Sequence, residues 1–264
     1  MGIIRRTLGS RTIGSLTSPH TIDHFLEQIH PMLTVDEVRA RVVKVVHETG
    51  DASTVVLRPN GAWRGFVPGQ HVQFGIEVDG KRRVRVFSVS SSHANRDATF
   101  SVSVKAHPDG YVSQFLHSGL APRTIVHLSQ AEGEFVLPDV VPDQVLLLSG
   151  GSGITPVMSM IRTLRDRKHQ GEITFLHYAR SRADEMFADE LDRLADDLPG
   201  ARVVRIYTRE PEKDAALAGR FHVDHLKHLG VDASDTLTYV CGPAGLIASV
   251  RDTYDDLGAG DQLR

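Results

Sequence analysis

The first pattern in the chain is a series of short apolar runs between about residues 33 and 140. These runs are rich in β-branched residues, which is typical of strands. Short segments containing Pro, Gly, Asn or Asp separate them. The predicted strands are 41–46, 53–57, 71–76, 83–88, 99–105 and 124–128. Strands this short and closely spaced indicate an antiparallel barrel or sandwich, interrupted by one helix at about 111–118.

After Pro142 the pattern changes to strands that alternate with helices. Residues 145–149 form a continuous apolar run, followed by a glycine-rich loop and a helical pattern. The elements predicted here are strands 145–149, 173–178, 202–207 and 236–241, and helices 156–167, 185–197, 223–229 and one that starts at Pro243. Such alternation predicts right-handed βαβ units and a parallel sheet.

The chain therefore divides into two predicted domains. The antiparallel β domain occupies residues 33–140 and the α/β domain residues 141–264, with the boundary near 138–144. Residues 1–32 precede both as a lead-in. Apolar residues in 21–29 recur at helical spacing, so the lead-in is predicted to be helical.

Composition excludes several classes of protein. The chain has 264 residues, 41% of them hydrophobic and 24% charged, which suits a protein with a buried core. A formal net charge of -3 argues against a nucleic-acid-binding surface. No apolar stretch reaches the roughly 18 residues of a membrane span, and no secretory signal follows Arg5-Arg6, so we expect a cytoplasmic protein. The single cysteine, Cys241, excludes a four-cysteine iron–sulfur or zinc site within this chain.

Two segments of the β domain carry groups suited to a phosphate-containing cofactor. On a predicted strand, Arg85 and Phe87 point to one side and Ser88 to the other. Arginine offers bidentate hydrogen bonds to a phosphate, and an aromatic ring offers a stacking surface. Gly110 and Ser113 stand where a short helix begins, and the backbone N–H groups there form a ready anion site. Taken singly, each segment is also compatible with an ordinary strand end or turn.

The α/β domain has two further candidate segments. Residues 150–156 read Gly-Gly-Ser-Gly-Ile-Thr-Pro between a strand and a helix, where glycines let the backbone approach a pyrophosphate. Ile154 stands where the Gly-x-Ser-x-Gly turn of serine hydrolases has its last glycine, so that activity is excluded. Residues 241–243 read Cys-Gly-Pro at the end of a later strand. Ligands of open α/β sheets bind at the carboxyl ends of strands, so both turns should meet, although a lone cysteine is also often a small buried residue.

Three histidines, His222, His225 and His228, lie three residues apart on one predicted helix. No carboxylate or thiol accompanies them at a metal-binding spacing, so we interpret them as a solvated helix face and predict no metal site. Trp63 and Tyr111 are interpreted as packing or rim residues.

Together, and in this order, the four segments resemble the ferredoxin–NADP reductase superfamily, above all the reductase components that supply oxygenases and desaturases. The resemblance covers about residues 33–264. It implies an FAD-binding antiparallel β-barrel followed by a nicotinamide-dinucleotide-binding α/β domain.

The resemblance also implies roles for individual residues. Arg85 should bind the FAD pyrophosphate, Phe87 should stack on the flavin, and Ser88 should bond near flavin N5. Further FAD contacts are assigned to Ser91, Val104, Gly110, Val112 and Ser113. The nicotinamide dinucleotide should be held by Gly151, Gly153, Thr155 and Pro156, and its nicotinamide ring by Cys241, Gly242 and Pro243. Ser88 and Cys241 are the candidate catalytic residues, which orient the rings and form no covalent intermediate.

Two departures from the family pattern are visible. Phe87 stands where relatives usually have tyrosine, so one hydrogen bond to the cofactor is absent. The sequence printed here stops at Arg264, where relatives often continue into an aromatic-bearing strand, and some carry a ferredoxin domain after that. The expected electron acceptor is thus a separate ferredoxin-like 2Fe-2S protein or a fused C-terminal ferredoxin domain absent from this sequence.

NADPH is favoured over NADH on the strand ends of the α/β domain. NAD sites usually place an acidic residue after the second strand, whereas an arginine there accommodates a 2′-phosphate. This chain has Arg180, Ser181 and Arg182 at that position and Arg209 after the next strand. The same arginines would also be expected on a merely solvated surface.

Two other functions remain compatible with these patterns. A free-flavin reductase uses the same fold but releases its flavin, and the two predicted FAD phosphate segments argue against it. A non-catalytic flavin- or nucleotide-binding regulatory module would not need candidate residues on both sides of a hydride path.

Overall fold

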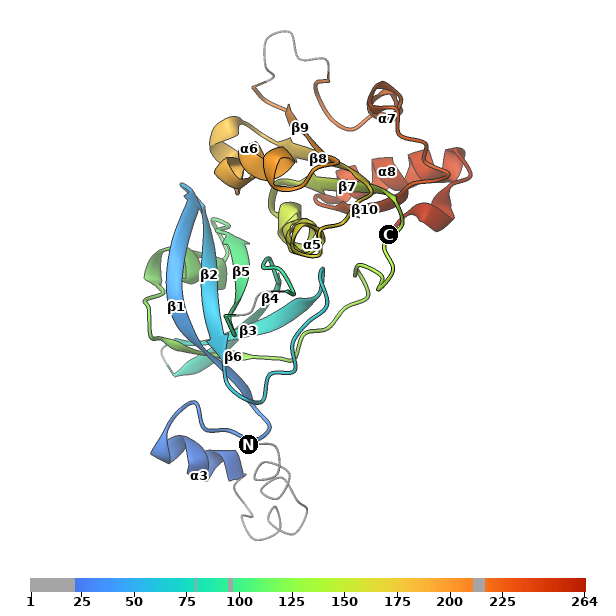
Figure 1. Ribbon diagram of the computed structural model, residues 1–264. Coiled ribbons are helices and arrows are strands. Elements are labelled where there is room, and N and C mark those ends of the chain that lie inside the picture. Colours follow the sequence, from blue (N-terminus) through green and yellow to red (C-terminus); the bar gives the residue numbers. More distant parts are fainter. Residues whose placement is uncertain (1–21, 79, 95–96, 211–216) are drawn as a thin grey trace.

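The computed structural model of the chain describes residues 22–78, 80–94, 97–210 and 217–264. Two sheets account for its strands: an antiparallel one in the first half and a parallel one in the second (Figure 1). This confirms the predicted order of an antiparallel β domain followed by a parallel α/β domain. Residues 1–21 of the lead-in lie outside the described residues.

The six strands of the first sheet wind into a barrel. They are β1 (Val38–Thr49), β2 (Ala52–Pro59), β3 (His71–Val78), β4 (Lys81–Ser88), β5 (Phe100–Lys105) and β6 (Ile125–Leu128). Their order is β4-β3-β6-β1-β2-β5, with antiparallel neighbours. A bridge between Val89 and Val102 joins the two edges and so closes the barrel. Inward-facing side chains such as Phe74, Val55 and Leu57 are fully buried in its core.

One helix expected in this half is split. The α-helical part, α4 (Tyr111–Gln114), is a single turn, and a π-helical turn, η1 (Phe115–Gly119), continues it. The wider turn brings His117 Nδ1 to 2.7 Å from the hydroxyl of Ser53 on β2. Sequence periodicity alone predicted one continuous helix, because a π-turn leaves little trace in the apolar pattern.

The parallel sheet has the order β10-β7-β8-β9. Its strands are β7 (Gln144–Gly150), β8 (Glu172–Ala179), β9 (Ala201–Tyr207) and β10 (Leu237–Cys241). The helices are α5 (Ile154–Asp166), α6 (Ala188–Asp197), α7 (Val223–Leu229) and α8 (Ala244–Asp256). One core cluster packs α5 and α6 on one face, and another packs α7 and α8 on the opposite face. Figure 1 shows α5 on the side of the sheet that faces the barrel.

Two local features of the α/β domain differ from the sequence expectation. Helix α6 begins at Ala188 and not at Glu185, because Phe187 adopts a left-handed backbone with φ 61°. His225 on α7 is buried, and its Nδ1 lies 2.8 Å from the Tyr178 hydroxyl. The histidine-rich helix is therefore only partly solvated, since one histidine serves as a packing and hydrogen-bonding residue.

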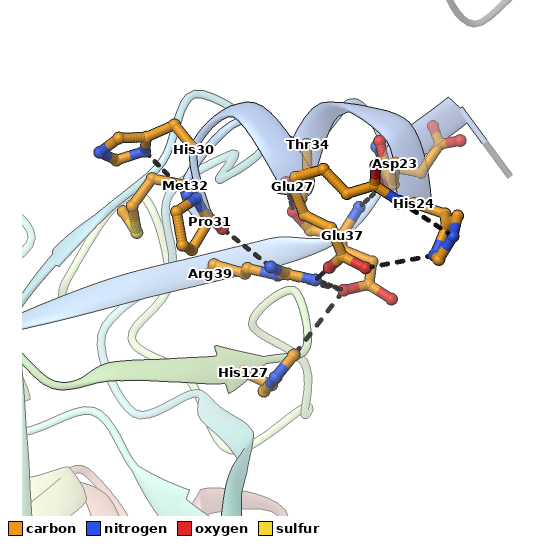
Figure 2. A network of polar contacts seen from close by, with 12 residues as sticks. Asp23, His24, Glu27, His30, Pro31, Met32, Thr34, Glu37, Arg39 and His127 are labelled. Atoms are coloured by element: carbon orange, nitrogen blue, oxygen red, sulfur yellow. Dashed lines mark hydrogen bonds and ion pairs between the residues drawn. The ribbon is translucent and has the colours of Figure 1, made fainter.

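The described part of the lead-in is a helix, α3 (Ile22–Ile29), at the end of the barrel far from the parallel sheet (Figure 1). Figure 2 shows that polar contacts hold it there. The Asp23 carboxylate accepts hydrogen bonds from the backbone N–H groups of residues 35–37. The buried Arg39 guanidinium bonds to Glu27, to Glu37 and to the Pro31 carbonyl. The lead-in is thus tied to β1 mainly by charge-assisted hydrogen bonds.

Candidate active site

A cleft of about 470 Å³ lies where the barrel meets the carboxyl ends of the parallel strands. Barrel strands β4 and β5 form one wall, and the loops after β7 and β10 form the other. Its lining residues are Val86, Phe87, Ser88, Ser103, Val104, Lys105, Gly150, Gly151, Ser152, Gly153, Thr155, Pro156, Cys241, Gly242 and Pro243. The cleft therefore brings together residues from three of the four segments that the sequence singled out.

The barrel wall presents side chains with few protein partners. Strand β4 is exposed over most of its length, and Val84 and Val86 are 39% and 56% exposed. Arg85 is also exposed, and its Nη1 donates a hydrogen bond of 2.8 Å to the backbone carbonyl of its neighbour Val84. The Phe87 ring packs edge-on against Phe74, with centroids 6.1 Å apart. An apolar strand surface beside an exposed guanidinium fits a cofactor with a flat ring and a phosphate group.

The segment from Gly110 to Ser113 forms a tight turn outside the cleft lining. The Ser113 hydroxyl donates to the Gly110 carbonyl and accepts from His107 N–H, at 2.9 and 3.2 Å. A Cβ on Gly110 would lie 2.4 Å from that hydroxyl, so a larger residue there would displace the Ser113 side chain. The first intrahelical bond of α4 is made by Gln114 N–H to Gly110, which leaves the amides of 111–113 ahead of it as available donors. These amides, more than the Ser113 hydroxyl, suit a phosphate.

The opposite wall is built from backbone in close contact. A Cβ on Gly153 would lie 2.2 Å from the Cys241 carbonyl oxygen, so the glycine loop and the Cys-Gly-Pro turn touch directly. Gly151 has φ +54°, in the left-handed region that favours glycine. Thr155 and Pro156 lie in the first turn of α5, and the Thr155 hydroxyl donates to the Ser152 carbonyl. The two turns predicted from the sequence to meet therefore do so.

Cys241 lies in a row of side chains that crosses the parallel sheet. It pairs in register with Ser149, which pairs with His177, and the Ser149 hydroxyl lies 2.7 Å from His177 Nδ1. Burial lowers the pKa of His177 to about 3, and the positive charge of Arg205 acts in the same direction. Burial raises the pKa of the Cys241 thiol above its ordinary value. Both groups are therefore neutral at physiological pH: Cys241 lines the cleft as an uncharged side chain, and His177 is buried in the sheet behind it.

The strand-end arginines lie beyond the cleft lining and differ in their partners. Arg180 Nη2 binds Asp184 at 2.6 Å. Arg182 binds Glu185 and Asp192, each at 2.7 Å, and these contacts hold the pKa of its guanidinium above the ordinary range, with Asp192 the largest contributor.

The other two residues predicted at these strand ends are Ser181 and Arg209. The Ser181 hydroxyl donates to Asp184 at 3.0 Å. Arg209 is exposed after β9, and its side chain forms no ion pair with any acidic group in the described ranges. Arg209 is therefore the strand-end arginine most available to an added anion.

Sequence patterns did not single out Lys105, Asp51 or Ser103 of this region. Lys105 lines the cleft, and its Nζ binds Asp51 of the β1–β2 turn at 2.8 Å and lies 3.8 Å from Asp184 of the α/β domain. Burial raises the pKa of Asp51, but hydrogen bonds from Lys105 and Thr49 outweigh it and the net pKa is lowered. Ser103 also lines the cleft. The sequence gives no signal for them, because their partners are distant along the chain.

Ser91 was predicted to contact the cofactor, and the structure places it at the junction of the two domains. It is buried, its hydroxyl accepts from Ser101 N–H, and its carbonyl accepts from Ser159 on α5. Arg85, the 110–113 turn and the strand-end arginines likewise lie outside the cleft lining, along the surfaces that extend from it.

These two walls define a class of protein: an oxidoreductase in which a flavin-binding barrel faces a dinucleotide-binding sheet. Residues 40–137 match the family described as oxidoreductase FAD-binding domain, and residues 147–252 match the oxidoreductase NAD-binding domain. The chain belongs to the ferredoxin–NADP reductase superfamily of FAD- and NAD-binding oxidoreductases.

Individual relatives support this membership. An NADPH oxidoreductase of Mycobacterium tuberculosis is 37% identical over 94% of this chain and 64% of its own length. A glycine betaine monooxygenase reductase subunit of Chromohalobacter salexigens is 32% identical over 83% of this chain and 60% of its own. The FAD/NAD-binding domain of a nitric oxide dioxygenase from Vibrio cholerae has a TM-score of 0.76 at 26% identity, covering 86% of this chain and 97% of that domain. The chain thus spans less than two thirds of the two curated relatives.

No helix among the described residues is long and apolar enough to cross a membrane.

Proposed function

We propose that this chain takes a hydride from NADPH onto a bound FAD and passes the electrons singly to a ferredoxin-type 2Fe-2S protein that serves an oxygenase or desaturase. The observation that carries the proposal is the cleft itself, where Phe87 and Ser88 of the barrel face Gly153 and Cys241 of the α/β domain. FAD, when bound, accepts two electrons as a hydride and releases them one at a time, which nicotinamide does not readily do.

The chain's own residues supply binding and orientation. Arg85 and the amides of residues 111–113 would neutralise the FAD pyrophosphate, while Phe87 would support one face of the ring system. The glycine loop would hold the dinucleotide pyrophosphate at the start of α5, and Cys241 would limit the position of the nicotinamide as a neutral, compact side chain. None of these roles requires a change of protonation in the cleft, and Ser88 and Cys241 orient the rings.

NADPH preference would depend on the arginines at the ends of β8 and β9. Arg209 is exposed and has no acidic partner in the described ranges, and Arg180 is 46% exposed on its side chain. A 2′-phosphate between these strand ends would gain charge-assisted hydrogen bonds that NADH cannot offer. Arg182 is held by Glu185 and Asp192 and would contribute mainly through its charge. The M. tuberculosis relative, named an NADPH oxidoreductase, agrees with this choice.

The acceptor is proposed from chemistry and from relatives. One cysteine cannot form a four-cysteine cluster, so a 2Fe-2S centre must belong to another protein or domain. Exposed basic residues suit an acidic partner: Lys81, Arg82 and Arg83 on β4, and Arg64 in the segment between β2 and β3. The monooxygenase reductase subunit relative is consistent with such a partner. The cytoplasmic location expected from the sequence stays a prediction.

The test uses the chain as purified, without added FAD, under anaerobic conditions. We expect a yellow protein whose visible flavin band is bleached quickly by NADPH and more slowly by NADH. Oxidised plant-type 2Fe-2S ferredoxin should then restore the band, with two ferredoxins reduced for each NADPH consumed. A colourless protein that reduces added free flavin would overturn bound-FAD electron transfer in favour of a free-flavin reductase. Bleaching that ferredoxin cannot reverse would overturn the acceptor class alone.

A further inference from the structure

Side chains of helix α5 form hydrogen bonds to barrel residues 90–93, the segment that directly follows β4. Arg162 Nη1 donates to the Ser90 carbonyl at 2.5 Å, and the Ser159 hydroxyl donates to the Ser91 carbonyl at 2.8 Å. The Thr163 hydroxyl oxygen accepts from His93 N–H at 3.1 Å. Positions 159, 162 and 163 fall on one face of the helix, so all three bonds cross the same domain interface.

The α5 side chains that make these cross-domain bonds are largely buried. Ser159 and Thr163 are fully buried, and the Arg162 side chain is 14% exposed. Few water molecules can compete for such donors and acceptors, so each bond is costly to leave unmade. The interface therefore holds one arrangement of the two domains in preference to neighbouring ones.

Arg162 is itself held from the α/β side. Its Nε and Nη2 form a paired contact with the Glu190 carboxylate at 2.8 and 2.5 Å, and its guanidinium lies over the Phe187 ring at 4.8 Å from the centroid. Phe187 takes a left-handed backbone with φ 61°, which is uncommon for an aromatic residue and places its ring at the start of α6. The guanidinium is thus fixed by α6 and has Nη1 left for the barrel.

On the barrel side, Ser90 is a junction of several bonds. Its N–H donates to the Ser101 carbonyl, and its hydroxyl lies 2.7 Å from that of Ser103, which lines the cleft. The neighbouring Val89–Val102 bridge closes the barrel. Ser90 stands two residues after Ser88, so the carbonyl held by Arg162 is tied closely to the flavin wall.

We propose that Arg162, supported by Ser159 and Thr163, is a positioning residue that sets the separation between the dinucleotide loop and the flavin-facing strand. This inference rests on the proposed function. Helix α5 begins at the glycine loop, with Gly153 at its N-cap, so the helix connects that loop rigidly to Ser90. The rate of hydride transfer falls steeply as the distance between donor and acceptor increases. A misplacement of about 1 Å can lower the rate on the order of 100-fold.

The test compares R162M with R165M. Arg165 lies one turn further along α5 and contacts Glu190, Asp166 and Asp197, all within the α/β domain. Both variants remove an arginine contact of Glu190, but only R162M removes the bond to the barrel. At saturating NADPH, we expect flavin bleaching in R162M to slow about 10- to 100-fold, with NADPH affinity changed by less than about 3-fold. R165M should stay within about 2-fold of the unmodified protein.

A second readout does not depend on turnover. In the oxidised, FAD-loaded protein, amide hydrogen exchange at His93 should accelerate about 10-fold or more in T163V, which removes the acceptor but keeps the side-chain volume. S159A gives a second kinetic test in case R162M does not fold, with an expected slowing of about 3- to 10-fold. If R162M and S159A bleach as fast as R165M, the positioning role is wrong.

Failure of the proposed function would look different. If the unmodified protein is not bleached by NADPH, the hydride-transfer function and the positioning role defined through it both fall. In that case dithionite would still bleach bound flavin. Faster amide hydrogen exchange at His93 in T163V would still establish the hydrogen bond between α5 and the barrel as a structural feature. Normal bleaching in the unmodified protein with no difference among variants would overturn the inference alone.

Discussion

On the α/β side of the cleft, backbone packs against backbone, whereas on the barrel side exposed side chains project from one strand. Gly153 has no room for a Cβ beside Cys241, while Arg85 and Val86 on β4 are open to solvent. The dinucleotide wall is thus shaped before any ligand binds. The flavin wall offers groups whose partners must come from a cofactor. The comparison indicates that substitutions on the first wall act through steric fit and those on the second through lost binding.

The largest effect is expected from G153A. The added Cβ would lie 2.2 Å from the Cys241 carbonyl oxygen, so the glycine loop and the Cys-Gly-Pro turn must separate. We expect flavin bleaching by NADPH to slow at least about 100-fold, because nicotinamide placement is disturbed, while FAD stays bound. G245A is the matched control, since nothing lies within 4 Å of its Cβ and its rate should be nearly unchanged. Equal rates in G153A and G245A would refute the preformed wall.

The next effect concerns the opposite wall. R85M should weaken FAD binding about 10- to 100-fold, since a charge-assisted hydrogen bond contributes about 1.5–3 kcal/mol. The measurement is fluorescence titration of the FAD-depleted protein with FAD. Arg58 on β2 is similarly exposed, and R58M should leave FAD affinity unchanged. Loss of FAD affinity in both variants would mean that overall charge, and not Arg85, is responsible.

Stability should depend on pH through the buried row beneath the dinucleotide wall. His177 has a folded pKa of about 3 against an ordinary 6.5, so between these values the unfolded chain binds a proton that the folded chain does not. The free energy of unfolding therefore falls on acidification, and His177 alone contributes a loss of about 2 kcal/mol between pH 7 and pH 5. Urea unfolding at the two pH values measures it. H177N cannot ionise, and its loss should be smaller by about that amount; an identical loss would contradict the assignment.

The smallest effect is expected at the strand ends. R209A should reduce the preference for NADPH over NADH about 10-fold, equivalent to about 1.4 kcal/mol, because the exposed guanidinium would no longer meet the 2′-phosphate. The ratio of kcat/KM for the two nucleotides is the measurement. R251A, which removes an exposed arginine from α8, is the control and should leave the ratio unchanged. A ratio unaffected by R209A would remove Arg209 from the site.

Much of the fold could be predicted from the sequence, because alternation of apolar residues and glycine-containing turns are local signals. The strands of both sheets and the contact between the glycine loop and the Cys-Gly-Pro turn follow from them. The start of α6 could not be predicted, since it depends on the left-handed backbone of Phe187. Nor could the burial of His225, which needs its distant partner Tyr178.

The same holds for the candidate site, whose residues could be predicted only where they belong to a local motif. Phe87, Ser88 and the residues of both turns were identified because each carries a local motif. Lys105 and Arg162 carry none, and their importance comes from cross-domain partners, Asp184 for Lys105 and Ser90 for Arg162. Ser91 was assigned to the cofactor by its place in a motif, and its contacts lie with Ser101 and Ser159 at the domain junction.

The most direct test of the central claim is a single-turnover reaction of the FAD-loaded protein with NADPH in the absence of oxygen. The account predicts that flavin bleaching and NADPH loss proceed mole for mole in one phase. Replacing the transferred hydrogen of NADPH with deuterium should slow that phase. Loss of NADPH without bleaching, or bleaching without loss of NADPH, would contradict hydride transfer between the two walls of the cleft.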